Sequence, residues 1–427
     1  MTSTDASAPT VDAQPADPAD HSGHPDRADH ADHPDRPVPI HGPAFAADPH
    51  RVYERLRRHG PVAPVEIAPG VEALLVTDYQ AALDLLRDTD TFSKDSRAWQ
   101  RTVSPTSPLL PVLGYRPTAL FSDGEVHARY RQVITDGLAL LEPHVLQRRV
   151  AEVAHRLIDT FEATGTADLI AEYARQLPVF VFNTWFGVPE EHSARLVAGI
   201  GSLIESTEKA VAAYGDLLAV VTAMVAERRE RPRHDLTSWF LTHPAGLDDD
   251  EVVRQITLTM IAGHQPTTNL IGNALLRLLT DARYAGSLFG GAMTAYQAID
   301  EVLWHEPPMA NLSAHYPRYD ITFHGREIPA GSLVLVSYAA ANSQAAPPTG
   351  GTGLRSGESA HLAWAAGPHA CPARDPALLI AITAIEQLTS RLGDLELATP
   401  AEELLWRPGP FHRALVHLPV RFQPVSG

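Results

Sequence analysis

The sequence predicts a mainly α-helical fold with small β-sheets gathered on one side. Apolar residues recur at helical spacing through most of residues 125–306, which indicates a series of amphipathic helices. Short apolar runs typical of strands lie before and after this region, within residues 62–76 and 321–338. No linker and no repeat at a fixed period interrupts the chain after Pro39, so we expect a single domain over residues 37–427.

Local patterns place the elements along the chain. A turn at Pro69-Gly70 joins two strands into a hairpin. A loop rich in Pro and Gly fills residues 345–372 and is followed by a helix to about residue 391. The other predicted elements are a helix at 48–59, strands at 62–67, 73–76, 321–323 and 333–338, and a loop with a strand at 408–422.

Residues 1–36 differ in composition from the rest of the chain. They are rich in Asp, Pro, Ala and His and contain almost no large apolar side chain. Such a segment cannot bury enough apolar surface to offset the entropy that ordering costs, so we expect a disordered tail.

Composition and charge exclude several classes of protein. The 427-residue chain has one cysteine, which excludes internal disulfides, four-cysteine zinc sites and cysteine-ligated iron–sulfur clusters. Its formal net charge of −17 argues against a nucleic-acid partner, because phosphate binding needs a basic surface. No stretch is apolar enough for a membrane span and no signal peptide begins the chain, so we expect a cytoplasmic protein without a membrane partner.

The single cysteine lies in the stretch His361-Leu-Ala-Trp-Ala-Ala-Gly-Pro-His-Ala-Cys-Pro-Ala-Arg374. Gly367 and Pro368 allow a tight turn before Cys371, and Pro372 can open a helix directly after it. A helix N-terminus favours the thiolate, which is the form that ligates a metal. Because a lone cysteine is more often a small buried apolar residue, other stretches must support a metal site.

This stretch resembles the heme-ligating loop of the cytochrome P450 family, whose pattern is Phe-Gly-x-Gly-x-His-x-Cys-x-Gly. The pattern positions around the cysteine are held here by Trp364, Ala365, Gly367, His369 and Ala373. The resemblance covers about residues 39–425 and implies an α-rich fold that holds heme b between two long helices. It also implies that Cys371 ligates the iron and that Trp364, Gly367 and His369 contact the heme.

Two further stretches resemble parts of the family that bind heme propionates. His127 and Arg131 are four residues apart, so on a helix both side chains project from one face toward the same anion. In the strand that the resemblance implies near residue 315, His315 stands where the family carries an Arg. A protonated His315 would bind a propionate, and an ordinary strand residue is the alternative.

The stretch Glu301-Val-Leu-Trp304 resembles the Glu-x-x-Arg helix of the family but lacks its Arg. In the family, this Glu and Arg join a downstream Arg in a buried network. Trp304 brings no charge, so Glu301 needs another donor, and we expect Arg355 to be that donor. The chain resembles soluble actinobacterial members of the family, and among them an atypical subgroup that carries this Trp. Because the pattern around Trp304 is intact, we expect the fold to be kept.

Residues 261–269 resemble the long helix that crosses the heme face, and this resemblance places Ala262 against the heme. Gln265 and Pro266 hold the acid and hydroxyl positions that deliver protons for oxygen activation in the family. Gln cannot ionise, and Pro has neither a hydroxyl nor an amide hydrogen. Thr267 or Thr268 could take over only if the helix rotated. Two alternatives stay open: a kinked buried helix with ordinary chemistry, or altered oxygen chemistry.

Together these stretches predict a heme-thiolate oxidoreductase that uses O2 to oxidise a small-molecule or peptide substrate in secondary metabolism. Monooxygenation is the main prediction. Oxidative coupling of aromatic rings without oxygen insertion is one alternative, and a non-catalytic heme protein is the other. The segments that vary in the family are apolar and aromatic here, and from them we predict that Trp99, Met309 and Phe411 contact the substrate.

The electrons for this reaction must come from another protein, because the chain has no flavin or NAD fingerprint. The resemblance implies a ferredoxin that is reduced by a ferredoxin reductase. Ferredoxins are acidic, so docking needs a local basic patch. The candidate residues for this patch are Arg129, Arg148, Arg149 and Arg374.

Overall fold

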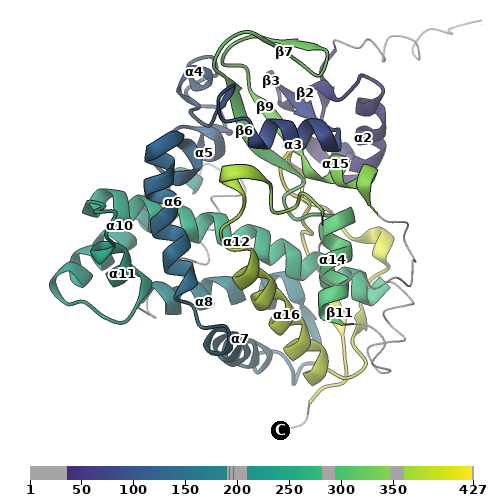
Figure 1. Ribbon diagram of the computed structural model, residues 1–427. Helices are drawn as coiled ribbons and strands as arrows, with labels where there is room; N and C mark the ends of the chain where they lie inside the picture. Colours follow the sequence, from purple (N-terminus) through teal and green to yellow (C-terminus); the bar gives the residue numbers. More distant parts are fainter. Residues whose placement is uncertain are drawn as a thin grey trace, which may run out of the picture.

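The computed structural model describes residues 36–189, 192, 196, 209–280, 294–346 and 360–425. The predicted tail lies outside the described residues except for Arg36, and so does Arg355. Helices make up most of the molecule, and its largest sheet gathers at one end (Figure 1). The prediction of a mainly α-helical fold with small sheets is confirmed.

The largest sheet has six strands in the order β1-β2-β3-β9-β6-β4. β2 and β3 form the predicted antiparallel hairpin, and Gly70 supplies the positive φ of 73° at its turn. β9 is parallel to β3, and β6 is antiparallel to β9. The bounds are β1 Val38–Pro39, β2 Val62–Ala68, β3 Val71–Val76, β4 Phe92–Ser93, β6 Asn311–Pro317 and β9 Val334–Ser337.

Short helices and two smaller sheets surround this framework. β5, β10 and β11 form a three-stranded sheet, and β7 and β8 form a hairpin. The strands are β5 Thr166–Asp168, β7 Ile321–Phe323, β8 Arg326–Ile328, β10 Glu396–Leu397 and β11 Pro419–Arg421. The short helices are α1 Gly42–Ala47, α2 Pro49–Arg57, α3 Tyr79–Arg87, α4 Arg97–Gln100, α5 Leu110–Leu113, η1 Ala119–Phe121, η4 Gly367–His369, η5 Ala401–Glu403 and α15 Tyr338–Ala345.

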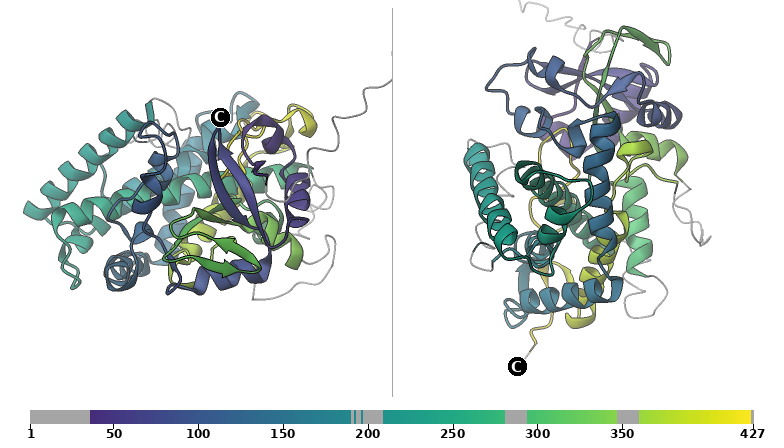
Figure 2. Two further views of the ribbon diagram at one scale, coloured as in Figure 1. Left: turned by 90° about the horizontal axis from the view of Figure 1, so that it is seen from above. Right: turned by 60° about the vertical axis from the view of Figure 1, so that its left-hand side comes forward.

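The remaining helices form the larger body of the molecule, with α12 running through it (Figures 1 and 2). α8, α10, α14 and α16 all pack against α12. In the part of the chain that the structure describes, no helix is both long and apolar enough to cross a membrane. These helices are α6 Gly124–Ala139, α7 Pro143–Ile158, η2 Leu169–Ala174, α8 Gln176–Phe186, α10 Lys209–Glu230, α11 Leu236–Thr242, α12 Asp249–Thr280, α14 Ala295–His305 and α16 Arg374–Arg391.

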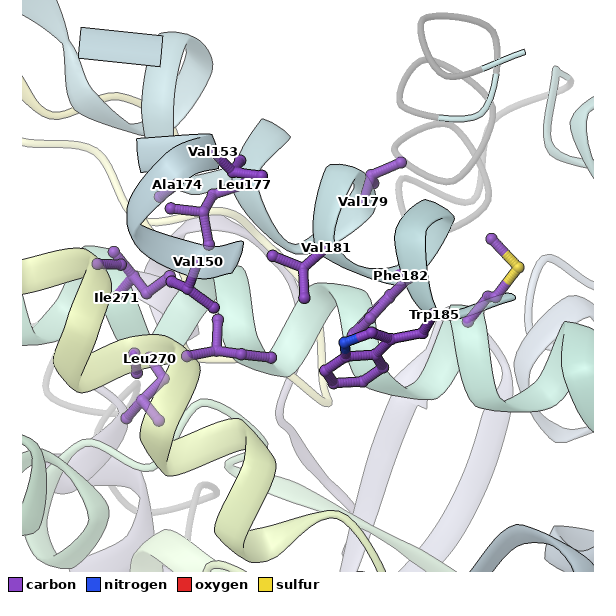
Figure 3. Close-up of a cluster of buried hydrophobic side chains, with 14 of the residues drawn as sticks. Val150, Val153, Ala174, Leu177, Val179, Val181, Phe182, Trp185, Leu270 and Ile271 are labelled. Atoms are coloured by element: carbon purple, nitrogen blue, oxygen red, sulfur yellow. The ribbon is translucent and has the colours of Figure 1, made fainter. Parts of the chain in front are cut away.

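The core between α7, α8 and α12 fixes the position of α12. Figure 3 shows its apolar side chains meeting from all three helices, with Val150 from α7, Val181 from α8 and Leu270 from α12. Gly263 of α12 is required at this contact, because a Cβ there would lie 2.8 Å from the ring of Phe182. The close approach of α8 therefore depends on a residue without a side chain.

Asn342 of α15 connects α14 to the segment that leads into the cysteine loop. The helical partner of the Leu303 carbonyl would be the N–H of residue 307, but Pro307 has none. The side-chain amide of Asn342 donates to this carbonyl at 3.0 Å and accepts from the Leu362 N–H at 2.7 Å. Asn342 is fully buried, so water cannot take its place as the hydrogen-bond partner of these two backbone groups.

Replacing Asn342 with Ala should therefore destabilise the protein by roughly 2–4 kcal/mol, because two buried backbone groups lose their partner. Urea unfolding of the holoprotein measures the change. Gln344→Ala is the matched control, since Gln344 lies on the same helix but makes an exposed hydrogen bond, and it should cost less than about 0.5 kcal/mol. Equal stability of the two variants would contradict the assigned role of Asn342.

Candidate active site

The loop that carries Cys371 is held in place by its own backbone. Gly367 has a φ of 69°, and a Cβ there would collide with the carbonyl oxygen of Leu86 in α3. The N–H of Cys371 donates to the carbonyl of Trp364 at 2.8 Å and closes the loop. α16 begins three residues later, so the thiol lies just before its N-terminus, as the sequence predicted.

Ala365 shares the left-handed backbone of this loop, with a φ of 58°. It stands at the first Gly position of the family pattern, and an alanine in this conformation is strained by about 1 kcal/mol or more. The loop therefore has the backbone shape that the pattern of glycines would give, although one glycine is missing.

Some of the surroundings of the Cys371 sulfur raise its pKa and others lower it. Burial raises the pKa of the Cys371 thiol, and a hydrogen bond from the backbone of Ala373 and the charge of Arg131 oppose this rise. Pro372 between them has no N–H to offer. The sulfur thus has one backbone donor and one nearby cation.

Helix α6 brings His127 and Arg131 against the cysteine loop, on one face as their spacing predicted. The Arg131 guanidinium donates to the carbonyl of Ala370, and Nε2 of His127 lies 3.3 Å from the carbonyl oxygen of Pro368. The rings of His127 and His369 have their centroids 3.8 Å apart. The two predicted cofactor-binding residues of α6 therefore meet the loop of Cys371.

Lys94 is a buried cation in this region that the sequence did not reveal. Its ammonium group donates to Ser313 Oγ at 3.1 Å and to the carbonyl of Ala314 at 3.0 Å. Burial lowers the pKa of Lys94 to about 7, and Asp123 opposes this effect. The pattern gave no signal, because Lys94 lies in a short polar segment that resembles an exposed loop.

His315 lies in β6, in surroundings that disfavour its charged form. Burial and the charge of Lys94 lower the pKa of His315 well below its ordinary value, so its imidazole is neutral near pH 7. His315 Nδ1 lies 2.5 Å from the carbonyl oxygen of Ser313, whose hydroxyl oxygen accepts from the ammonium group of Lys94.

These basic side chains fit the carboxylates of a heme. Burial and the charges of Lys94, His127 and Arg131 lower the pKa of His369 to about 2, so cations gather here without enough anions. Asp123 is the one carboxylate that acts on Lys94 among the described residues, and it already pairs with Arg318 at 3.1 Å. Two propionates would supply the missing negative charge.

Trp304, at the Arg position of the family pattern, makes an aromatic contact. Trp304 is buried and its ring meets that of His361 edge to face, with centroids 5.6 Å apart. Burial lowers the pKa of His361 to about 4, so this contact is between neutral rings. Glu301 lies 3.6 Å from Arg277 and 3.8 Å from His305, whereas the predicted donor Arg355 lies outside the described residues.

A cavity of about 660 Å³ borders α12 on the side of the large sheet. Met309 and Phe411 lie on its wall, as predicted for substrate contacts. Trp99 does not line this cavity: it is buried in the core beneath the sheet, with its ring centroid 6.3 Å from that of Tyr316. One face of α12 completes the wall with Arg254, Thr257, Leu258, Ile261, Ala262, Gln265 and Pro266.

The four predicted catalytic residues of α12 do not all face the cavity, because successive residues of a helix point in different directions. Gln265 and Pro266 line the cavity, whereas Thr267 and Thr268 do not. Thr267 Oγ1 donates to the carbonyl of Gly263, on the side that packs against α8, so it is turned away from the cavity. Thr268 Oγ1 is buried and has no hydrogen-bond partner among the described residues.

Gln265 belongs to a polar group at the cavity wall. Its side-chain amide lies 2.7 Å from that of Asn269, and with its oxygen turned toward Arg407 it accepts from Nη1 at 3.2 Å. Arg407 also donates to Asn269 at 3.3 Å. The position that holds an acid in the family pattern is therefore occupied by an uncharged amide that contacts a cation.

Several known proteins are similar to this chain in sequence or in structure. Cytochrome P450 monooxygenase PikC of Streptomyces venezuelae is 30% identical over 90% of this chain and 93% of its own length. Vitamin D(3) 25-hydroxylase of Pseudonocardia autotrophica is 29% identical over 90% of this chain and 96% of its own length. The solved structure of CYP154C4 from Streptomyces sp. W2061 has a TM-score of 0.81 and 27% identity, and covers 92% of this chain and 99% of its own.

No family model matches the chain. The identity and coverage of the curated relatives nevertheless show that the chain belongs to the cytochrome P450 family. It is accordingly an enzyme, an oxidoreductase that binds heme. The resemblance inferred from the cysteine loop is confirmed over nearly the whole described chain.

Gly367→Ala should abolish normal heme binding, because the new Cβ collides with a backbone carbonyl that cannot give way. Ala365→Gly is the matched control, since it removes strain at the other left-handed position of the same loop and should keep or slightly raise stability. The heme content of each purified protein and its thermal unfolding measure both effects. A Gly367→Ala protein with full heme content would contradict the assigned backbone constraint.

Heme affinity should have a component that depends on Lys94 and weakens as the pH rises above 7. A propionate beside Lys94 raises its pKa above the value of about 7 in the heme-free protein, so binding takes up a proton. This stabilisation is complete below pH 7 and is lost as the pH passes the higher value of the heme-bound form.

Heme-transfer rates to a scavenger protein between pH 6 and 10 measure this component. Lys94→Arg should keep the affinity constant across this range through its permanent charge, and Lys94→Met should weaken it at pH 6 by roughly tenfold. An identical pH profile in wild type and both variants would exclude Lys94 from heme binding.

Proposed function

We propose that the protein is a monooxygenase in which Cys371 is the axial thiolate ligand of heme iron. The observation that carries this proposal is the arrangement around one helix. The substrate-sized cavity meets α12 at Ala262, Gln265 and Pro266, and the cysteine loop packs its Trp364 and Ala373 against the core to which α12 belongs. When bound, heme supplies the activation of O2 for oxygen insertion.

Each residue of the site has a role in this proposal. Cys371 holds the iron, with the Ala373 backbone and Arg131 stabilising its negative charge. His127, Arg131 and Lys94 hold the propionates, and neutral His315 and His369 pack beside them. The apolar wall with Met309, Phe411 and Ala262 excludes water and orients an apolar substrate. Secondary metabolism is the setting that the hydroxylases among the relatives favour.

A second candidate function is oxidative coupling of aromatic rings, and one observation favours it. Gln265 and Pro266, the residues at the proton-delivery positions, carry neither an acid nor a hydroxyl. Coupling inserts no oxygen, so it depends less on protons delivered from this helix. In monooxygenation, water must bring protons past the amides of Gln265 and Asn269, since Thr267 faces away from the cavity.

The proposed electron donor is a ferredoxin that is reduced by a ferredoxin reductase. Two of the basic residues considered for docking are engaged elsewhere: Arg129 forms a bidentate ion pair with Glu251, and Arg149 pairs with Glu152 at 2.7 Å. Arg148 and Arg374 are exposed on α7 and α16, which pack side by side near the cysteine loop. These two are the better candidates for contact with an acidic partner.

The absorption spectrum of the reduced, CO-bound protein tests thiolate ligation. We expect the red-shifted Soret band of a thiolate-ligated heme in wild type and its loss in Cys371→Ser, with Ser122→Ala unchanged because Ser122 lies outside the loop. A globin-like band in wild type would exclude Cys371 as the ligand.

Product analysis after turnover in ¹⁸O2 then separates the two chemistries. Labelled oxygen in the product supports monooxygenation, and an unlabelled cross-link supports coupling.

A further inference from the structure

The cavity beside α12 has an unusual charge. The whole chain carries 51 acidic and 34 basic residues, yet the described residues that line this cavity include no Asp or Glu. They include four arginines: Arg116, Arg175, Arg254 and Arg407. A largely apolar cavity whose only permanently charged side chains, among the described residues, are arginines attracts an anion.

Two of these arginines, Arg116 and Arg254, belong to segments that contact each other near the beginning of α12. Arg254 is on the cavity face of α12, and its neighbour Gln255 accepts from the Ala119 N–H at 3.0 Å. This bond holds the segment that follows Arg116 against α12. The guanidinium of Arg116 lies over the ring of Tyr214 from α10, 5.0 Å from its centroid.

Both guanidinium groups have N–H groups that could donate hydrogen bonds to a ligand. Arg116 donates to the carbonyls of Pro111 at 2.7 Å and Gly114 at 3.4 Å, neither of which carries charge. Arg254 is 4.0 Å from Asp250, whose side chain is 85% exposed, so this pair adds little. Nε of Arg254 is buried and has no hydrogen-bond partner among the described residues.

The distance along α12 sets the geometry of a ligand bound between these arginines and the heme face. Arg254 and Ala262 lie on the same side of the helix and are eight residues apart, which corresponds to roughly 12 Å. The wall between them is Thr257, Leu258 and Ile261, which contact an apolar body. A ligand that fits has an anionic group at one end and an apolar chain or ring system of about this length.

We propose that the substrate of this enzyme is an apolar molecule with a terminal oxyanion, a carboxylate or a phosphate, that Arg116 and Arg254 bind. The two guanidinium groups hold the anion near the beginning of α12, and the apolar body reaches the Ala262 end for oxidation. This inference rests on the proposed function, because it assigns the substrate class of the same site.

Calorimetric titration of the holoenzyme at pH 7.5 tests the proposal with three ten-carbon probes. Decanoic acid carries a carboxylate, decyl phosphate carries a phosphate, and 1-decanol is uncharged. At least one anionic probe should bind about tenfold or more tightly than the alcohol, as charge-assisted hydrogen bonds to arginine provide. The better of the two anions identifies the head group.

Arg116→Met combined with Arg254→Met should reduce this preference to about threefold or less, with the affinity for 1-decanol unchanged. Arg254→Lys should keep part of it, since the charge remains but the fork of donors is lost. Arg421→Met is the control for a lost arginine, because Arg421 lies on β11 and pairs with exposed Glu396. It should bind all three probes as wild type does.

Equal binding of the acid, the phosphate and the alcohol by wild type would overturn the proposal, and so would a full preference in the double variant. An unchanged affinity for 1-decanol shows that a variant has kept its cavity. Calorimetry does not depend on the axial ligand, so a missing thiolate band with an intact preference would refute the proposed function and leave this inference standing.

Discussion

The absence of a side chain at residue 367 is the constraint on which the active site depends. At Gly367 the backbone turns with a positive φ directly against the carbonyl of Leu86, where no Cβ fits. This contact joins the cysteine loop to α3, which belongs to the sheet end of the molecule, while α16 after the loop belongs to the helical body (Figure 1). The loop therefore lies where the two parts meet, and the position of the thiol follows from both.

Two of the described contacts near this loop are uncharged. Trp304 and His361 meet as uncharged rings, and Asn342 supplies the donor that Pro307 removes from α14. Burying an ion pair costs desolvation that its attraction often only just repays, so an apolar substitute of similar size can hold the same fold. Glu301 lies near Arg277 and His305 with its side chain 27% exposed, but its Oε2 is buried and has no hydrogen-bond partner among the described residues.

The charges of the site divide into two groups with different tasks. Lys94, His127 and Arg131 lie on the side of the cysteine loop, where we propose that they bind the heme carboxylates. Arginines alone carry the permanent charge on the described wall of the substrate cavity, and the family's acid has become Gln265 in contact with Arg407. The same substitution that removes a proton donor from α12 also keeps the cavity free of negative charge, which suits an anionic ligand.

Periodicity and local motifs in the sequence were enough to predict the helical body, the hairpin at Gly70, the cysteine loop and membership of the family. These features depend on residues close together in the chain, where spacing alone decides which side chains share a face. Helix α15 was missed, because its small residues Tyr338–Ala345 have no amphipathic pattern and owe their helix to burial beside α3.

Only the tertiary structure decided which polar groups are charged and which side chains reach the cavity. In the sequence, Lys94 looks like a loop residue, His315 like a cation and Trp99 like a substrate contact, whereas the structure buries all three side chains. Arg129 looked available for a partner until Glu251, 122 residues away, was seen to bind it. Solvation and pairing depend on neighbours that the fold brings from distant parts of the chain, and these determine pKa values and access.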